Sequence, residues 1–155
     1  MQPLVGIRRA TPEDAEAIWS THRTSVLGLT APEYTQDQIA AWLDLTPDDF
    51  RASMARGELF FVAESAGDVL GFAAVRGDEA RAVYVRPDAV RRGIGTRLLD
   101  AVEREVRAGG GTAVTCEATL NAVPFYLANG YVETGRSDRT VRGVALPSVR
   151  MTKDL

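Results

Sequence analysis

Cysteine and histidine are almost absent from this chain. Cys116 is the only cysteine and His22 the only histidine. A single cysteine excludes an internal disulfide and is typical of proteins in a reducing compartment, so we expect a cytoplasmic protein. One cysteine and one distant histidine also make no cluster of metal ligands, because a zinc site needs about three or four such ligands. The sequence therefore predicts no metal centre.

Long apolar runs and an excess of positive charge are missing as well. No apolar run approaches the ~20 residues that a membrane-spanning helix needs, and the first residues lack the pattern of a signal peptide. The chain has 18 Lys and Arg against 21 Asp and Glu, a net charge of -3. Nucleic-acid-binding proteins usually have a basic balance or a basic face. We therefore expect neither a membrane nor a nucleic acid as a partner.

Length and composition are those of an ordinary globular protein. The chain has 155 residues, of which 45% are hydrophobic and 25% charged. This is enough to bury a core, and no linker or repeat divides the chain. We therefore expect one domain over residues 1–155.

Capping motifs predict three helices in the first third of the chain. Thr11, Thr35 and Thr46 are each followed three residues later by an acidic or amide residue, which is the pattern of a capping box. The motifs predict helices over 11–26, 36–44 and 47–56, and the first range includes its N-cap, Thr11. Residues 4–10 before them are expected to form a short strand.

The hydrophobic period changes after Gly57. Residues 58–65 and 69–77 predict an antiparallel hairpin, and residues 79–87 predict a third neighbouring strand. Apolar residues then recur at helical spacing from 94 to 108, where three glycines end the pattern. A strand over 112–118, a short helix over 121–130 and about two more strands complete an α/β (α+β) order around a mixed sheet.

The stretch from Arg91 to Thr96 is the densest chemical signal. It places Gly93 and Gly95 between two arginines and a helix start. Unpaired amides at a helix N-terminus bind anions, glycines allow close approach, and arginines add charge. A dinucleotide site would need a third glycine, and a P-loop would need Gly-Lys-Ser/Thr; neither is present. A pyrophosphate held by backbone amides remains, beside the equally open alternative of a plain turn with solvated arginines.

A second motif lies about thirty residues further on. Asn121 precedes Pro124-Phe125-Tyr126, and Gly130-Tyr131 follow. With both motifs in this order, the chain resembles the GNAT superfamily of acyl-CoA-dependent N-acyltransferases, over nearly its whole length and most densely from Gly71 to Gly135. The resemblance implies a mixed, mostly antiparallel sheet of about seven strands flanked by about four to five helices. It also implies acetyl-CoA as cosubstrate and direct transfer to a primary amine of a small molecule or peptide in a ternary complex.

The resemblance assigns cofactor-binding residues to both motifs. Backbone amides of the loop would hold the pyrophosphate, strand backbone would hold the pantetheine arm, and the N–H of Val83 or a neighbour would point at the thioester carbonyl. Asn121 would pair with pantetheine amides, unless it is simply a helix N-cap. Val90 stands where family members usually have Gln or Arg, so Arg91 or Arg92 is expected to compensate. The implied set is Val83, Tyr84, Val85, Arg91, Arg92, Gly93, Ile94, Gly95, Thr96, Asn121 and Phe125.

Two residues are implied in catalysis. Tyr126 stands where the family keeps a tyrosine that protonates the leaving thiolate; the alternative is an aromatic that only packs. Glu79 stands where some members place a general base that accepts the amine proton directly or through water. Alternatively, Glu79 is a solvated acidic residue in a turn, and the reaction uses ordered water alone as the proton acceptor.

The acceptor side is the variable part of the family. Tyr34 and Trp42 are candidates to line an amine cleft, as is Glu117, and His22 is either structural or a polar group facing the substrate. Acidic residues in this region would suit a cationic acceptor: Glu33, Asp37 and Asp44. Cys116 is interpreted as a small buried strand residue.

The alternatives to an enzyme remain open. One is a CoA-binding sensor or regulatory module with little or no catalysis; another is a nucleotide enzyme that prefers NAD or ATP. A homodimer is common in the family and is therefore also possible here.

Overall fold

One seven-stranded sheet organises the residues that the computed structural model describes, which are 3–29 and 33–155. Its strand order is β1-β2-β3-β4-β5-β7-β6, and only the β4–β5 pair is parallel. The strands are β1 (Gly6–Arg9), β2 (Leu59–Ser65), β3 (Asp68–Arg76), β4 (Glu79–Val85), β5 (Ala113–Thr119), β6 (Val132–Val141) and β7 (Val144–Asp154).

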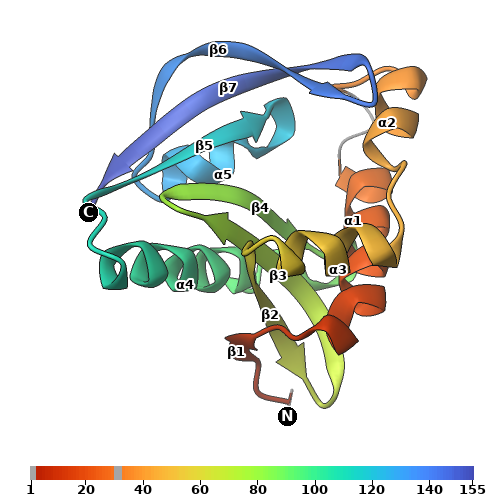
Figure 1. Ribbon diagram of the computed structural model, residues 1–155, viewed down its shortest axis with the longest axis vertical. Helices are drawn as coiled ribbons and strands as arrows, with labels where there is room; N and C mark the ends of the chain where they lie inside the picture. Colours follow the sequence, from red (N-terminus) through yellow and green to blue (C-terminus); the bar gives the residue numbers. More distant parts are fainter. Residues whose placement is uncertain (1–2, 30–32) are drawn as a thin grey trace.

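Helices cover both faces of this sheet (Figure 1). The α-helices are α1 (Ala15–Leu29), α2 (Gln36–Trp42), α3 (Pro47–Ala55), α4 (Ile94–Ala108) and α5 (Val123–Ala128). Three short 3-10 helices are η1 (Pro12–Asp14), η2 (Pro87–Ala89) and η3 (Leu120–Ala122). The predicted fold class is confirmed: a mixed, mostly antiparallel sheet of seven strands with five α-helices. Within the described residues, no helix combines the length and the apolar character that crossing a bilayer would require.

The central strand β3 is buried on both faces, which explains its almost unbroken apolar run. Ala73 and Val75 belong to the core under α4 and α5, whereas Phe72 and Ala74 belong to the core under α1 and α3. A strand covered on both faces needs apolar side chains at every position rather than at alternate ones. A different hydrophobic core therefore packs against each face of β3.

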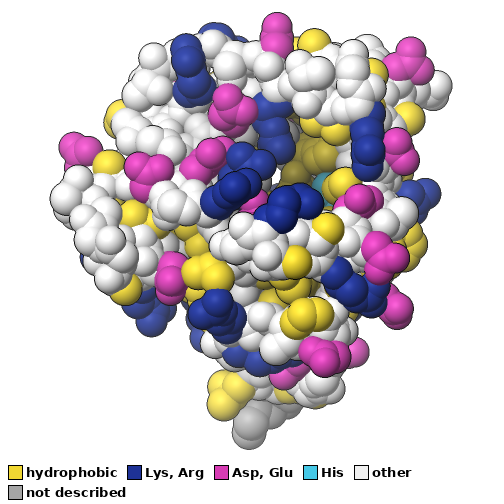
Figure 2. Space-filling view, in the orientation of Figure 1, with side chains coloured by type: hydrophobic (Ala, Val, Ile, Leu, Met, Phe, Trp, Pro, Cys, Tyr) yellow, Lys and Arg dark blue, Asp and Glu magenta, His cyan; other side chains and the backbone are white. Residues whose placement is uncertain are grey.

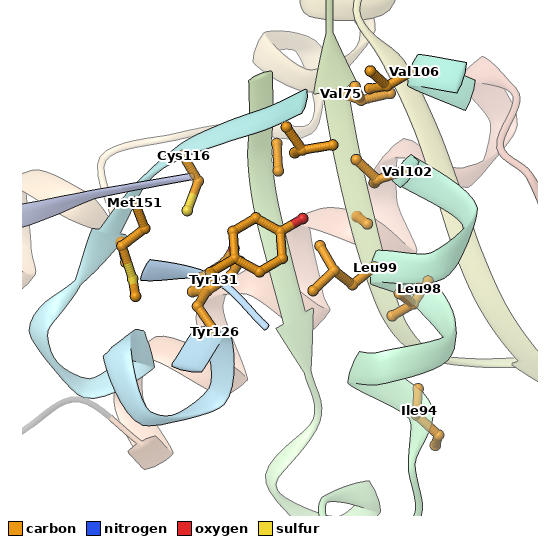
Figure 3. Close-up of a cluster of buried hydrophobic side chains, with 14 of the residues drawn as sticks. Val75, Ile94, Leu98, Leu99, Val102, Val106, Cys116, Tyr126, Tyr131 and Met151 are labelled. Atoms are coloured by element: carbon orange, nitrogen blue, oxygen red, sulfur yellow. The ribbon is translucent and has the colours of Figure 1, made fainter. Parts of the chain in front are cut away.

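The core under α4 is the larger one (Figure 3). α4 has apolar residues at helical spacing, and Leu98, Leu99 and Val102 are at most 1% exposed. Tyr131 reaches this core from the end of α5, and its hydroxyl donates to the buried Glu103 carboxylate at 3.0 Å. Lys153 also donates to Glu103, at 3.0 Å, so this buried charge is paired. The α4 face thus holds α5 and β5 in a fixed position against β4.

The predicted capping boxes before residue 57 are all present. Thr11 and Asp14 cap η1, which leads directly into α1. The Thr35 hydroxyl accepts from the Gln38 amide at 3.2 Å to start α2. Thr46 and Asp49 do the same for α3. These contacts span only three residues, which is why the sequence alone is enough to predict them.

Strand β4 carries a bulge that decides which side chains face which core. Ala74 pairs with Ala82 and Val75 pairs with Ala80, so Arg81 is an extra residue in β4. A bulge shifts the alternation of the side chains by one residue. Ala80 consequently packs in the α4 core, and Ala82 packs toward α1, although they are only two residues apart.

Candidate active site

Strands β4 and β5 separate soon after they begin, and a cavity opens between them. They pair only at Glu79–Thr115 and Ala80–Cys116. Beyond Ala80 the β5-facing edge of β4 has no strand partner within the described residues, so its amides and carbonyls face this opening. The β4/β5 cavity has a volume of about 370 Å³. A gap of this kind suits a long, narrow ligand that pairs with strand backbone.

Most of the predicted cofactor-binding residues line this one cavity. They come from β4, from the loop before α4, from the first turn of α4, and from η3 and α5. The lining includes Val83, Tyr84, Val85, Val90, Arg91, Gly93, Ile94, Gly95, Thr96, Asn121, Phe125 and Tyr126. The structure therefore brings together two motifs that are about thirty residues apart in sequence.

The N-terminus of α4 closes one side of the β4/β5 cavity. Gly93 is the N-cap of this helix, in the left-handed region at φ 74°, which glycine adopts without a steric cost. Arg91, two residues earlier, also has a positive φ, of 63°. The first amides of a 15-residue helix have no partner within the helix and lie at its positive end. This part of the cavity is suited to a phosphate group.

Gly95 lies directly against α5. A Cβ built at this position would lie 2.9 Å from Cε1 of Phe125. Any side chain at residue 95 would therefore push Phe125 away or fill space at the cavity. The second glycine of the loop is required for room, whereas the first is required for its backbone conformation.

Asn121 does not cap a helix, so that interpretation is wrong. Thr119 is the N-cap residue of η3 and Ala122 that of α5, and Asn121 lies inside η3. Its Oδ1 atom is buried and has no hydrogen-bond partner within the described residues. A buried acceptor without a partner costs roughly 1–3 kcal/mol. Because the residue lines the β4/β5 cavity, a ligand N–H there would remove this cost.

Tyr126 extends from α5 into the same region. It is 5% exposed and packs edge-on against Phe125 at 5.2 Å and Tyr131 at 5.3 Å between ring centroids. Its hydroxyl makes no hydrogen bond within the described part of the chain. Burial raises the pKa of Tyr126 well above its ordinary value, so the phenol stays protonated at neutral pH. A protonated phenol is a proton donor.

Two predicted residues, Arg92 and Glu79, lie differently from the rest. Arg92 is exposed and does not line the cavity, so Arg91 is the arginine that does. Glu79 lies outside the cavity and accepts from Arg81 Nη1 at 3.2 Å. It lines two neighbouring cavities. One shares Ala80, Arg81, Glu117 and Arg139 with the β4/β5 cavity, and the other shares only Glu117 with it. Val90, which stands where the family usually has Gln or Arg, lines the β4/β5 cavity and offers only an apolar side chain there.

A second cavity opens on the other side of β4, and we call it the aromatic cavity. It has a volume of about 360 Å³. His22, Trp42, Phe50, Phe60, Phe72 and Tyr84 form its aromatic lining. The Trp42 indole donates to the Tyr84 hydroxyl at 3.1 Å, and His22 lies edge-on to Tyr84 at 4.9 Å.

The structure supports some of the acceptor-side expectations and contradicts others. Trp42 lines the aromatic cavity, but Tyr34 is buried, where its hydroxyl donates to Pro147 O at 2.7 Å and accepts from the Leu120 amide at 3.0 Å. Glu33, Asp37 and Asp44 do not line the cavity, so they do not make it acidic. Glu117 lines the β4/β5 cavity instead, and Cys116 is 3% exposed in the α4 core.

Arg139 was not among the residues predicted for the site. This residue of β6 lines both main cavities, and its charge acts on Tyr84, Tyr126 and His22. No motif marks it. The only available signal is that alternate residues of β6 are partly buried, and Arg139 is one of them.

Comparison with known proteins agrees with this geometry. Residues 30–155 match the model of the acetyltransferase (GNAT) domain family. The peptidyl-lysine N-acetyltransferase YjaB of Salmonella typhimurium is 26% identical over 148 residues, 96% of this chain and 97% of that protein. A crystal structure described as a GCN5-related N-acetyltransferase from Rhodopseudomonas palustris is 34% identical. It covers 100% of this chain and 98% of that one, with a TM-score of 0.92.

A more distant structure shares the fold. PaiA N-acetyltransferase from Thermoplasma acidophilum, solved in complex with coenzyme A, is 21% identical and has a TM-score of 0.77. The alignment covers 98% of this chain and 99% of that one. The fold and the family model together define an acyltransferase. The chain belongs to the GNAT family of acetyltransferases.

Proposed function

We propose that this chain transfers the acetyl group of acetyl-CoA to a primary amine, which attacks the thioester directly in a ternary complex. The observation that carries the proposal is the buried, unpaired Oδ1 of Asn121 beside Tyr126, in a cavity that ends at the N-terminus of α4. Family membership supports the reaction, and the coenzyme A bound to the related PaiA fold supports the cosubstrate.

The residues of the β4/β5 cavity fit such a cosubstrate. Amides from Arg91 to Thr96 would hold the pyrophosphate, with the Arg91 side chain beside it. The unpartnered edge of β4 at Val83 to Val85 would pair with the pantetheine amides, and Asn121 Oδ1 would accept from one of them. The N–H of Val83 or a neighbour is the candidate donor to the thioester carbonyl.

Proton transfer is assigned to two side chains. The amine nitrogen forms a bond to the carbonyl carbon, the carbon–sulfur bond breaks, and Tyr126 gives its proton to the leaving sulfur. Glu79 takes the amine proton through water, because it lies in a polar cavity next to the reaction site rather than in it. Direct attack is favoured over an acyl-enzyme because Cys116 is buried and its pKa is raised to about 12, chiefly by that burial.

The acceptor is an amine of a small molecule or a peptide. The relative YjaB bears the name of a peptidyl-lysine acetyltransferase, which is the argument for a peptide. The limited size of the aromatic cavity, with a volume of about 360 Å³, is the argument for a small molecule. We also propose that residues 1–155 act as one domain in the cytoplasm. The continuous sheet from β1 to β6 and the lone buried cysteine support this.

Release of free thiol from acetyl-CoA tests the proposal. The purified protein is offered polyamines, amino acids, aminoglycosides and lysine peptides, and coenzyme A binding is measured separately by calorimetry. Thiol release that depends on both the amine and the protein is expected. Tight coenzyme A binding with no release for any amine would instead favour a CoA-binding sensor or regulatory module. Preference for NAD or ATP over coenzyme A would contradict the cofactor assignment.

A further inference from the structure

The aromatic cavity has an apolar floor and a charged rim. Six aromatic rings from six different elements form the floor, and the rim carries Arg56, Arg81, Arg139, Arg142, Asp49 and Glu58. Figure 2 shows this region as a hollow with a yellow floor, in which the cyan of the single histidine is visible between groups of dark-blue side chains. Four arginines stand against two acids, in a chain whose overall charge is negative.

The aromatic cavity adjoins the β4/β5 cavity at the middle of β4. Arg81, Ala82, Tyr84 and Arg139 line both. A molecule in the aromatic cavity would therefore have one end beside the strand that is assigned to the acyl-pantetheine arm. If the proposed function holds, this cavity is the place for the amine, and its lining selects the acceptor.

Both acids of the rim are already engaged. Glu58 Oε1 accepts from Arg81 Nε at 3.2 Å, and Arg81 also reaches Glu79 at 3.2 Å. Asp49 accepts from the backbone amide of Thr46 at 2.7 Å and lies 3.8 Å from Arg142. Each carboxylate therefore already has a positively charged partner within the protein.

Two arginines of the rim, Arg56 and Arg139, are paired less closely with opposite charge than these two acids. Arg56 donates to the Ser53 hydroxyl at 3.3 Å and forms no ion pair within residues 3–29 and 33–155. Arg139 has its nearest carboxylate, that of Glu117, at 4.0 Å, and its side chain is 31% exposed. The two residues line the same cavity from α3 and β6. Arg56 therefore leaves a positive charge at the rim without a paired carboxylate, and Arg139 has only a long ion pair.

The floor offers no charge of either sign. His22 is 4% exposed among Trp42, Phe50 and Tyr84, so it is neutral at physiological pH. An uncharged aromatic floor favours an apolar group, which gains about 25 cal/mol for each Å² of apolar surface removed from water.

We propose that the acceptor is a small amine with an apolar side chain and a carboxylate, as in an apolar α-amino acid, and that Arg139 and Arg56 bind its carboxylate. The apolar side chain lies against Trp42, Phe50 and Tyr84, and the amine points toward the middle of β4. Arginine binds carboxylates through paired, charge-assisted hydrogen bonds, which also orient the ligand. A lysine side chain would bring a second positive charge to a rim that is already positive.

Binding of an unreactive ligand tests the cavity without catalysis. In the presence of coenzyme A, 3-phenylpropionate is compared with 3-phenylpropanamide by calorimetry; the two differ only in the carboxylate. The acid is expected to bind at least about tenfold more tightly, and Arg139→Gln to remove most of this difference. Arg136→Gln is the matched control, because Arg136 lies on the same strand, is exposed and lines neither cavity.

Rates with reactive amines test the same idea in turnover. Phenylalanine is compared with phenylalaninamide and 2-phenylethylamine, and leucine with leucinamide, each as kcat/KM from thiol release. The free amino acids are expected to be at least about tenfold better, with the preference lost in Arg139→Gln and reduced in Arg56→Gln. A melting temperature for each variant shows that it is folded, and the Arg56 variant serves if the Arg139 variant is not.

The outcomes separate this inference from the proposed function. Thiol release with equal or better rates for amides and plain amines, unchanged in both arginine variants, would overturn the inference and leave the acetyltransferase standing. Arginine-dependent binding of phenylpropionate without thiol release from any amine would support the cavity assignment and contradict the proposed reaction. Failure of both the binding and the rate preference overturns the inference.

Discussion

Gly95, in the first turn of α4, lies directly against the ring of Phe125 on α5, and a Cβ at residue 95 would come within 2.9 Å of that ring. Two helices that are separated by a whole strand thus meet at the cofactor-binding loop. Both residues line the β4/β5 cavity, at the end where we place the pyrophosphate. The contact also makes the second glycine of the loop sensitive to any substitution.

Gly95→Val is expected to weaken coenzyme A binding by more than about tenfold, or ~1.4 kcal/mol. The branched side chain displaces Phe125 and narrows the cavity, although it adds no backbone strain in a helix. Calorimetric titration with coenzyme A measures the change. Gly6→Ala is the control, since a Cβ there meets no atom within 4 Å. Wild-type affinity in the Gly95 variant would show that the loop does not contact the cofactor.

Asn121→Ala should separate stability from binding. It removes a buried acceptor that has no partner, so the melting temperature of the free protein stays the same or rises. Coenzyme A affinity should fall about tenfold, because one hydrogen bond to the pantetheine arm is lost.

Asn129→Ala is the control for Asn121→Ala, because it is expected to lower stability and to leave coenzyme A affinity unchanged. Asn129 Nδ2 donates to Phe125 O at 2.8 Å, so its loss should lower stability by about 1 kcal/mol. Thermal unfolding with and without coenzyme A measures both effects. A large loss of stability in Asn121→Ala would mean that its side chain is structural.

Tyr126→Phe is expected to lower kcat by about 100-fold or more and to leave coenzyme A affinity nearly unchanged. The ring and its packing remain, and only the proton donor is removed. Tyr131→Phe is the matched control. The Tyr131 hydroxyl donates to Glu103 inside the core, and the residue lines neither cavity. Stability should therefore fall in the Tyr131 variant, and turnover should fall in the Tyr126 variant. Equal turnover in wild type and Tyr126→Phe would remove the residue from the mechanism.

Glu79→Gln tests the proton acceptor. If Glu79 receives the amine proton through water, kcat should fall about tenfold or more, and the dependence of the rate on pH should change with it. Its ion pair with Arg81 is largely solvated, so little stability is at stake. Glu133→Gln, an exposed change on β6, provides the comparison. A Glu79 variant with wild-type rates at every pH would leave ordered water as the only acceptor.

His22 should make the protein less stable in mild acid. Burial lowers the pKa of His22 to about 4, with a smaller contribution from the charge of Arg139, whereas an unfolded histidine titrates near ~6.5. The unfolded state therefore binds more protons between these values, and stability falls as the pH falls from about 6.5 to about 4. The full effect is about 3 kcal/mol.

Urea unfolding at several pH values in this window measures the effect. His22→Phe keeps an aromatic ring among the same neighbours but cannot titrate, so its stability should depend less on pH than that of the wild type. Parallel curves for the two proteins would show that the buried histidine is not the cause. The difference between the curves is the relevant quantity, because other groups titrate in both proteins.

The sequence by itself determined the features that depend on near neighbours. Capping boxes such as Thr35 with Gln38 act over three residues, and the change of hydrophobic period after Gly57 reflects the switch from helices to strands. The loop was recognisable because Gly93 has a left-handed backbone conformation at the start of α4, which is a local requirement. Two such motifs in order were enough to predict the family and the fold.

Only the tertiary structure decided the character of the two cavities. The bulge at Arg81 changes the face of every following residue in β4, and no alternation in the sequence reports it. The missing partner of Asn121 becomes visible only in the folded chain, where its Oδ1 atom is buried. The acids near residue 40 do not line the aromatic cavity, whereas Arg139, whose charge acts on His22, lines it from a strand more than one hundred residues away. Contacts over such distances come from packing of the sheet against its helices, which local sequence does not encode.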